Sequence, residues 1–449
     1  MDSIPPPSSG LSVDASGIFL VLITILVFFI PILILFPPVL PSQSEALAQT
    51  HIKIGLDRSK SNLKELKTRT TNPTIESLWI YPVKSCAGIE LSRSKVVPQG
   101  LEFDRLFTFA QLKSPFPATT SSDAKEGEQE KGEHTWHFIT QRQFPLLATV
   151  KVELYVPDAT RKPRPQDEDL APTESFIILR FPWRERGFAG VLSTLAAKLR
   201  GGLRARAEKE VLLPVVFPSE EEIKERWYDW EKVTIWKEVV EALNMGEELP
   251  EELRLYLGVS NKLGLFRVCP EKLREVGRGA PRREEAGYQP VTGFQDAFPV
   301  HLINVGSVED LEGKIGAVEG MERLDVRRFR PNIIVNGAKA YDEDEWKTVK
   351  LRSSGKAEEV AEFHVSCRTV RCKMPNVDQD SGFRHPVEPD RALRKYREVD
   401  EGARYMGCMG MQMTPLFEKT DDPEAMESWV EVGMEVEVLE RGSHRYVKQ

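Results

Sequence analysis

From Ile75 onward, the chain consists largely of short apolar or alternating runs that are separated by turn residues. The first of these runs are 75–81, 105–111, 136–140 and 149–156. Later ones are 233–236, 264–268, 300–304, 332–335, 362–365 and 435–439. Runs of this length and pattern are typical of β-strands. Because strands dominate, the sequence predicts an α+β fold, in which a mixed β-barrel is surrounded by helices.

Helical patterns are fewer and mostly short. They are expected at 187–200, from Ser219 to about Trp230, at 249–258, from 307 onward and at 389–397. The clearest helix start is Ser219, which is a good N-cap and is followed by three glutamates in the first turn. Gly258 is the residue type that commonly ends a helix.

The composition is that of a large globular protein. With 449 residues the chain exceeds the usual size of one domain, so one large or two fused domains are expected. Hydrophobic residues make up 41% of the chain, which allows a substantial core. The net charge of −8 argues against a nucleic-acid-binding protein, because such proteins usually have a basic bias. The five cysteines have no framework spacing, which indicates reduced thiols.

An uncharged run of twenty residues lies near the N-terminus at 17–36 (GIFLVLITILVFFIPILILF). A helix of this length measures about 30 Å, the thickness of the hydrocarbon core of a bilayer. No Lys or Arg precedes the run and several follow it, which favours the cytosolic side for the body of the protein. We therefore expect a single-pass membrane protein with a tail at 1–16, a transmembrane helix at 17–36 and a polar tether at 37–70. A cleaved targeting segment is the alternative.

Polar insertions interrupt the strand pattern at 113–135 and 158–174. Both are rich in charged residues and poor in aliphatic ones, so they are expected to be surface loops. A third insertion covers about 199–232.

Several common catalytic motifs are absent from the sequence. It contains no G-x-G-x-x-G and no Walker A motif, so no nucleotide-binding fold is predicted. It also has no C-x-x-C or ferredoxin-like cysteine run, which argues against an iron–sulfur centre. The close histidine pair His134 and His137 borders a polar insertion and has no further metal ligands nearby.

Cys372 is the residue that most directly suggests chemistry. It follows Arg371 at the start of the segment 371–382 (RCKMPNVDQDSG). A free cysteine is most often a small buried hydrophobe. Alternatively, its thiolate is a soft ligand for a metal, and a neighbouring arginine favours the thiolate by lowering the pKa of the thiol. Cys367 is the competing cysteine, but it does not adjoin the acidic run that follows Cys372, so we interpret it as structural.

Motifs at 81–86 (YPVKSC), 104–105 (DR), 328–332 (RFRPN) and 371–382 occur in the order found in the MOSC family. The chain resembles this family over about 72–440, and most closely its mitochondrial amidoxime-reducing members. The resemblance implies a β-rich N-terminal subdomain at 71–290 and a MOSC β-barrel domain at 291–440. It places a cofactor in the cleft between them.

The resemblance also implies the identity of that cofactor and the residues that bind it. It is the molybdenum cofactor, and Cys372 is the expected catalytic residue and ligand of the metal. The residues expected to contact the cofactor are Lys84, Ser85, Arg105, Arg142, Asp296, Arg330 and Asn332. Arginine and lysine suit the phosphate of molybdopterin, although most such residues are solvated surface charges. After Asp296, this chain has Ala297 and Phe298 where the amidoxime-reducing members have small hydroxyl residues.

The activity implied by the resemblance is that of an oxidoreductase that reduces small N-hydroxylated compounds, such as amidoximes and hydroxylamines. Since the sequence carries no second redox motif, the electrons must come from outside. The implied donors are cytochrome b5 and NADH-cytochrome b5 reductase, and the implied location is the mitochondrial outer membrane. A non-catalytic carrier of the molybdenum cofactor or of sulfur is the alternative.

Overall fold

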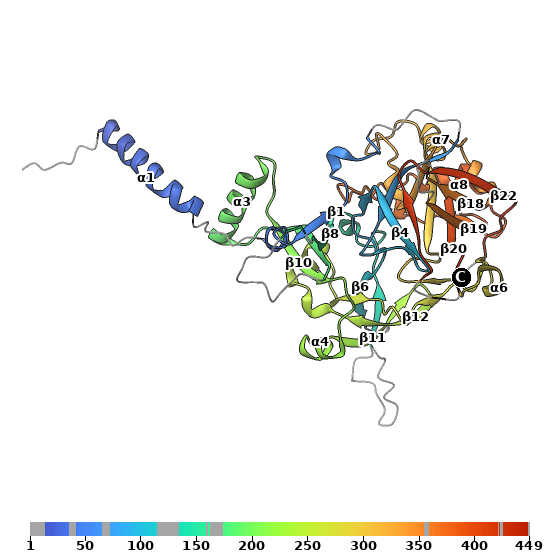
Figure 1. Ribbon diagram of the computed structural model, residues 1–449. Coiled ribbons are helices and arrows are strands. Elements are labelled where there is room, and N and C mark those ends of the chain that lie inside the picture. The colour runs from blue at the N-terminus through green and yellow to red at the C-terminus, as the bar shows by residue number, and fades with distance from the viewer. Residues whose placement is uncertain are drawn as a thin grey trace, which may run out of the picture. The chain divides into compact units, whose positions relative to one another are not determined.

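The computed structural model describes residues 14–35, 42–64, 72–114, 134–158, 160–161, 174–353, 359–420, 422 and 425–447 (Figure 1). The chain divides into two compact units. The smaller unit comprises Met1–Ser42 and Arg184–Ala207, and the larger one comprises Gln43–Trp183 and Glu208–Gln449. Most of the expected insertion 113–135 and of the insertion 158–174 lies outside the described residues.

The smaller unit contains the helices α1 (Ala15–Leu35) and α3 (Gly187–Gly201), and α3 confirms the helix expected at 187–200. In the described part of the chain, however, no helix combines the length and the apolarity that a membrane crossing requires. The predicted transmembrane helix at 17–36 is therefore wrong. The predicted run had only about the minimum length for a span, and its last residue, Phe36, lies outside the described residues. The single-pass location with the body facing the cytosol depended on this helix and is wrong for the same reason.

In the larger unit, five strands form a closed barrel in the order β11-β12-β13-β6-β7. Their bounds are β6 (Phe107–Lys113), β7 (Thr135–Phe138), β11 (Asp229–Ile235), β12 (Glu238–Asn244) and β13 (Leu263–Arg267). Ile235 pairs with Glu238, so only two residues, Trp236 and Lys237, connect β11 to β12. The barrel is filled by apolar side chains that include Trp136, Val233 and Phe266.

The helix expected from Ser219 to about Trp230 begins as predicted but ends early, as α4 (Glu220–Glu225). The Ser219 hydroxyl accepts a hydrogen bond from the Glu222 amide, and the Glu222 carboxylate accepts one from the Ser219 amide. Trp227 then adopts a positive φ of 57°, which stops the helix. Trp230 pairs with Leu243 in the barrel, so tertiary pairing overrides the local helical pattern.

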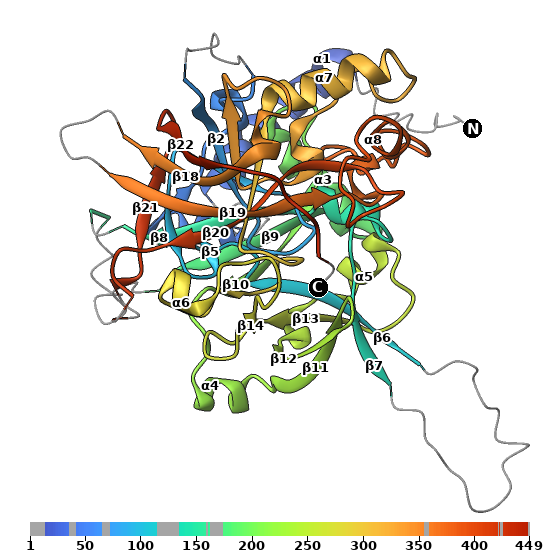
Figure 2. The same cartoon turned by 90° about the vertical axis from the view of Figure 1, so that its right-hand side faces the viewer.

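A second sheet has eight strands in the order β17-β16-β20-β19-β18-β22-β2-β3. Its strands are β2 (Thr74–Ile80), β3 (Ile89–Leu91), β16 (Val300–Asn304), β17 (Ile333–Asn336), β18 (Trp346–Arg352), β19 (Val360–Val370), β20 (Cys408–Leu416) and β22 (Glu435–Arg441). Because β2 also pairs with β17, the sheet closes on itself and leaves β3 outside the ring. Figure 2 shows β18, β19, β20 and β22 side by side. The ring unites an early strand with strands from the last third of the chain.

Smaller elements surround the barrel and this ring. The remaining strands are β1 (His51–Ile54), β8 (Lys151–Pro157), β9 (Phe176–Pro182) and β10 (Glu208–Pro214) in one sheet, β4 (Arg93–Val97), β5 (Gly100–Leu101) and β21 (Ser428–Glu431) in another, and the pair β14 (Arg274–Glu275) and β15 (Val291–Thr292). The remaining helices are α2 (Gln43–Leu47), α5 (Glu251–Leu257), α6 (Arg283–Ala286), α7 (Val305–Ile315) and α8 (Asp390–Tyr396). Helices α7 and α8 pack together against the ring (Figure 2). Part of the segment expected to be a tether, 37–70, forms β1, which pairs with β8.

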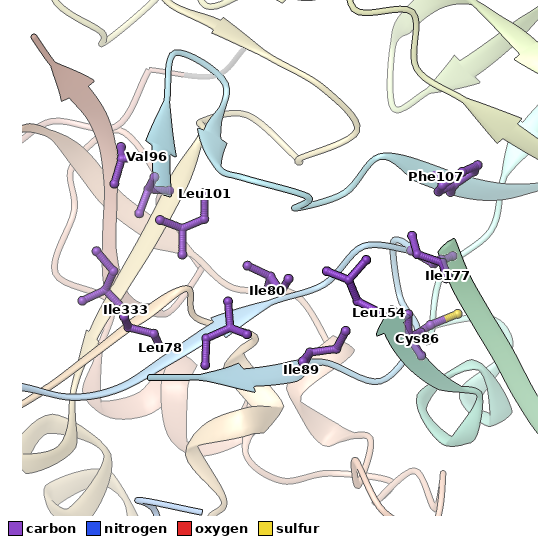
Figure 3. Packing of buried hydrophobic residues seen from close by; sticks show 14 of the residues in the cluster. Leu78, Ile80, Cys86, Ile89, Val96, Leu101, Phe107, Leu154, Ile177 and Ile333 are labelled. Atoms are coloured by element: carbon purple, nitrogen blue, oxygen red, sulfur yellow. The ribbon is translucent and has the colours of Figure 1, made fainter. Parts of the chain in front are cut away.

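One hydrophobic core joins these elements (Figure 3). Leu78 of β2 pairs with Ile333 of β17, and both are fully buried. The same cluster includes Phe107 at the start of β6 and Cys86 after β2. Burial raises the pKa of the Cys86 thiol to about 12, so this cysteine packs as a neutral apolar group. The core therefore fixes the ends of β2, β17 and β6, where polar side chains converge.

Candidate functional site

All the predicted site residues line a single cavity of about 550 Å³ in the larger unit. They are Lys84, Ser85, Arg105, Arg142, Asp296, Arg330, Asn332 and Cys372. Each of them follows or precedes a strand, as expected for a site built at strand ends. Because β2, β16 and β17 are neighbours in the ring, their ends bring together loops that are far apart in the sequence.

The backbone is strained at three of these residues. Ser85, Arg105 and Arg330 have φ values of 68°, 51° and 53°, in the left-handed region that favours glycine. In this conformation a residue other than glycine destabilises the folded chain by about 1–2 kcal/mol. Hydrogen bonds hold it in place: the Arg105 amide donates to Tyr81 O at 2.8 Å, and the Arg330 amide donates to Arg327 O at 3.0 Å. Strain of this kind concentrates at functional sites, where the surrounding fold maintains a fixed geometry.

Two buried arginines in the cavity wall have no acidic partner among the described residues. Arg330 is 4% exposed, and its Nη1 donates to Cys86 O at 2.7 Å while its Nη2 has no hydrogen-bond partner. The Nη2 of Arg371 donates to Phe329 O at 2.6 Å. Burial lowers the pKa of each guanidinium to about 10. A buried cation without a counter-ion is costly, so the donor set is suited to an anionic ligand such as a phosphate.

The aromatic ring of Tyr81 lies close to two cations of the cavity lining, Arg330 and Arg105. The guanidinium of Arg330 is 4.1 Å from the ring centroid, and that of Arg105 is 4.9 Å from it. Arg105 is also paired with Asp104 and donates to Asn332 Oδ1 at 3.3 Å. Asn332 is itself fixed, because its Nδ2 donates to Trp79 O at 3.1 Å. Tyr81 and Asn332 thus hold the two guanidinium groups in position.

Lys84 and Asp296 form the ion pair of the cavity. The Lys84 ammonium donates to Asp296 Oδ1 and to Phe294 O, both at 2.6 Å. Burial lowers the pKa of Lys84, whereas Lys84 and Arg105 outweigh burial at Asp296 and hold the pKa of that carboxyl well below its usual range. Asp296 is therefore ionised, and about half of its side chain is exposed.

Cys372 is the accessible thiol of the chain. It lies directly after β19, beside Arg371, and is partly exposed, whereas the other four cysteines are buried. Burial raises the pKa of Cys367 and of Cys408 to about 12, which keeps both thiols neutral. A metal ligand must be reachable, and Cys372 is the more exposed of the two cysteines that line the cavity, since Cys367 is only 3% exposed.

Comparison with known families agrees with this arrangement. Residues 72–171 match the MOSC N-terminal beta barrel domain, and residues 289–437 match the MOSC domain. The chain is a MOSC-domain protein. The predicted family resemblance is thereby confirmed, as is the barrel architecture within the predicted fold class.

Curated relatives of this MOSC protein are distant but cover most of it. "Mitochondrial amidoxime reducing component 2" of Rattus norvegicus is 22% identical over 77% of each chain. "Mitochondrial amidoxime-reducing component 1" of Homo sapiens is 22% identical over 74% of each chain. "Molybdenum cofactor sulfurase" of Arabidopsis thaliana is 24% identical over 83% of this chain and 36% of its own length.

In this MOSC chain the segment after Asp296 is apolar and packed. Phe298 is 3% exposed and lies in a small cluster with Val276 and Cys367. The carbonyl of Asp296 accepts a hydrogen bond from Arg274 Nη2 at 3.3 Å, so the backbone of this segment already has a partner. The hydroxyl contacts expected in amidoxime-reducing members have no counterpart at Ala297 and Phe298.

Sequence reasoning missed several residues that line the MOSC cavity. They are Trp236, Arg274, His301, Arg368, Gln412 and Tyr446. Gln412 lies in the Met-rich run 408–413. The run forms the start of β20: Met409, Met411 and Met413 are fully buried, while Gln412 reaches the cavity. The alternating pattern of this run was the available signal, whereas Trp236 and Tyr446 carry no motif.

Proposed function

We propose that this MOSC protein binds the molybdenum cofactor in the 550 Å³ cavity and is an oxidoreductase that reduces small N-hydroxylated compounds, such as amidoximes and hydroxylamines. One observation carries the proposal. An accessible thiol, Cys372, shares the cavity with the buried cations Arg330 and Arg371, which have no acidic partner among the described residues. The names of the amidoxime-reducing relatives support the same activity.

The proposed roles of the residues follow from their surroundings. Cys372 provides the thiolate ligand, and the unpartnered Nη2 of Arg330 donates to an anionic oxygen of the cofactor. Lys84, Arg105 and Asn332 hold the phosphate and the pterin, with Ser85, Arg142 and Asp296 beside them. When bound, the cofactor supplies the two-electron redox chemistry. Tyr81 holds Arg105 and Arg330 in place without contacting substrate.

The proposed reaction requires electrons and protons from outside the chain. Reduction of an N–OH group to N–H consumes two electrons and two protons and releases the oxygen as water. We propose cytochrome b5 with NADH-cytochrome b5 reductase as the source of the electrons, in keeping with the resemblance to amidoxime-reducing proteins.

A second candidate function is a non-catalytic carrier of the cofactor or of sulfur. The similarity to a protein named molybdenum cofactor sulfurase favours it. The two functions differ in turnover, since only a reductase converts an N-hydroxylated compound.

The decisive experiment uses the full chain produced in a host that makes the molybdenum cofactor. Molybdenum and molybdopterin are measured in the purified protein, and benzamidoxime reduction is then measured with cytochrome b5, its reductase and NADH. We expect stoichiometric molybdenum and formation of benzamidine. Background molybdenum in well-folded protein contradicts the reductase and a carrier of the cofactor, and leaves only a carrier of sulfur. Bound cofactor without turnover, combined with its transfer to a cofactor-free acceptor enzyme, supports the carrier.

A further inference from the structure

Trp236 occupies an unusual position in the lining of the cavity. It is the first of the two residues that connect β11 to β12, and it lines the cavity that contains Cys372. Its φ is 55°, in the region where a two-residue hairpin turn ordinarily has glycine or asparagine. A bulky side chain with positive φ is a true outlier, and strain of this kind clusters at functional sites.

Backbone strain like that at Trp236 also occurs at other residues of the cavity lining. Four residues that line the cavity share a positive φ without being glycine. They are Ser85, Arg105, Arg330 and Trp236. The first three are proposed to hold the cofactor, so the fourth has the backbone signature of the same site but no assigned role.

Packing alone does not account for the indole of Trp236. The residue is 44% exposed, so much of its ring remains open. What is covered is held firmly: the ring of Phe138 meets it edge-on with centroids 5.2 Å apart, and the guanidinium of Arg142 is 5.0 Å from its centroid. Its Nε1 donates to Asp296 Oδ1 at 3.2 Å, which ties the indole to the Lys84–Asp296 ion pair.

The charges around Trp236 define the kind of molecule that can lie against it. Basic residues outnumber acidic ones in the cavity lining. The basic residues are Lys84, Arg105, Arg142, Lys237, Arg274, Arg330, Arg368 and Arg371, and the acidic ones are Glu238 and Asp296. The cations assigned to the anionic cofactor do not count here, because the cofactor neutralises them. The remaining basic residues of the lining still outnumber the two acidic ones, which disfavours a cationic substrate; they are Arg142, Lys237, Arg274 and Arg368. The open indole face attracts planar conjugated groups.

We infer that Trp236 is a substrate-positioning residue, and that its indole selects planar, conjugated and uncharged N-hydroxylated substrates over aliphatic ones. This inference rests on the proposed reductase function. In that function, the indole orients the substrate in the cavity that Cys372 also lines and takes no part in the bond changes. The preference for a conjugated substrate is thus a property of the β11–β12 hairpin.

The test compares benzamidoxime with acetamidoxime in the holoenzyme, because the two substrates carry the same reacting group on an aromatic and an aliphatic frame. For Trp236→Leu we expect KM for benzamidoxime to rise roughly 3- to 10-fold, the range for loss of one aromatic pair. KM for acetamidoxime and kcat for both substrates should change less than about 2-fold. Trp236→Phe should restore most of the discrimination, because it keeps an aromatic ring. Trp236→Gly, which removes the strain, should fold as well as the wild type and lose the discrimination.

Trp227 offers a matched control. It is also a tryptophan with positive φ, 57°, is 81% exposed, and does not line the cavity. Trp227→Leu should leave the ratio of kcat/KM for the two substrates unchanged. An equal effect of Trp236→Leu on both substrates, or an equal effect of Trp227→Leu and Trp236→Leu on the ratio, overturns the inference.

A binding measurement separates this inference from the proposed reductase function. Benzamide and acetamide are unreactive, uncharged analogues of the two substrates, and their affinity for the holoenzyme is measured by calorimetric titration. We expect benzamide to bind more tightly than acetamide to the wild type, and equally weakly to Trp236→Leu. That result supports the inference even if neither amidoxime is reduced, in which case the reductase proposal alone fails. Equal affinity of benzamide for the wild type and for Trp236→Leu contradicts the inference, whatever the activity.

Discussion

Arg330 is held in a state that neither its backbone nor its charge favours. Its φ is 53°, its guanidinium is buried with one nitrogen unpartnered, and its pKa is lowered to about 10 by burial. The strained backbone and the buried unpartnered nitrogen each lower the stability of the chain by about 1–3 kcal/mol. A bound anion offsets the loss of hydration. Arg330 therefore lowers the stability of the unliganded protein but favours binding of the anion.

Arg330→Met should therefore affect stability and cofactor binding in opposite directions. Because methionine fills similar space without a charge, the cofactor-free variant should unfold at the same temperature as the wild type or higher. The same variant should retain much less molybdopterin after gel filtration. Thermal unfolding of both cofactor-free proteins and a pterin assay of both loaded proteins measure the two effects. A clearly lower unfolding temperature with full pterin retention would show that Arg330 is structural.

The two cysteines near the end of β19 should respond differently to substitution. Cys372→Ala removes the proposed ligand and should abolish benzamidoxime reduction with little change in stability. Cys367→Ala empties part of a packed cluster and should cost about 1 kcal/mol of unfolding free energy while most of the activity remains. Activity per bound molybdenum and the urea midpoint of each variant distinguish these outcomes. Equal losses of activity in two folded variants that both retain the metal would refute the ligand assignment.

At the scale of elements, α7 begins beside a buried carboxyl group. Glu343 accepts hydrogen bonds from Ser307 Oγ at 2.6 Å and from Asn304 Nδ2 at 3.1 Å. Asn304 in turn caps α7 by accepting from the Gly306 amide. Burial raises the pKa of Glu343 to about 7, so the group that joins β16, α7 and the loop after β17 is neutral in slightly acidic solution.

This raised pKa predicts how stability depends on pH. Below the ordinary carboxyl pKa, Glu343 is protonated in the folded and the unfolded chain, and the full stability is present. As the pH rises toward 7, the unfolded chain releases the proton first, so the free energy of unfolding falls, by an amount of order 3 kcal/mol. Glu343→Gln should flatten this slope between pH 5 and 7, whereas Glu345→Gln, at an exposed position of the same turn, should keep it. Urea titrations across this pH range provide the comparison.

The elements differ in how far the sequence could predict them. Strands such as 300–304 and the αL cap at Gly258 follow from local pattern and were predicted correctly. The residues of the cavity were found because their motifs resemble a family, although their convergence depends on the pairing of β2 with β17. The end of α4 could not be predicted, because it depends on the pairing of Trp230 with Leu243, and the local sequence pattern does not show this pairing. No local sequence pattern marks Trp236 either, because the feature that distinguishes it is its positive φ.

At the scale of the whole molecule, charge is distributed unevenly. The chain carries a net charge of −8, yet the lining of the cavity is predominantly basic. A negatively charged electron donor would therefore be attracted to the mouth of the cavity and repelled by the average surface. This charge pattern predicts that the reaction rate with the proposed donor, cytochrome b5, depends on salt concentration.

Electron supply gives the prediction at this scale. NADH alone should not support turnover at any concentration, because the sequence carries no nucleotide-binding motif, whereas addition of cytochrome b5 and its reductase should restore it. High salt should slow the restored reaction, since the Debye length falls to about 3 Å at 1 M. Rates of benzamidine formation with each combination, at low and high salt, provide the test. Direct NADH oxidation by the isolated protein in the presence of benzamidoxime would show that the chain binds NADH itself.

The closed ring of strands also limits how early the fold can be completed during synthesis. β2 is synthesised early, but it pairs with β17 and with β22, whose first residue follows that of β2 by about 360 residues. At roughly 5–20 residues per second, a ribosome needs on the order of 20–70 s to deliver that partner. During this interval β2 lacks its pairing with β22, and Lys84 and Ser85 cannot meet Cys372 until that residue has been synthesised. Nascent chains of this protein should therefore depend on chaperones until β22 emerges, and the cavity is incomplete until Tyr446, which also lines it, has been synthesised.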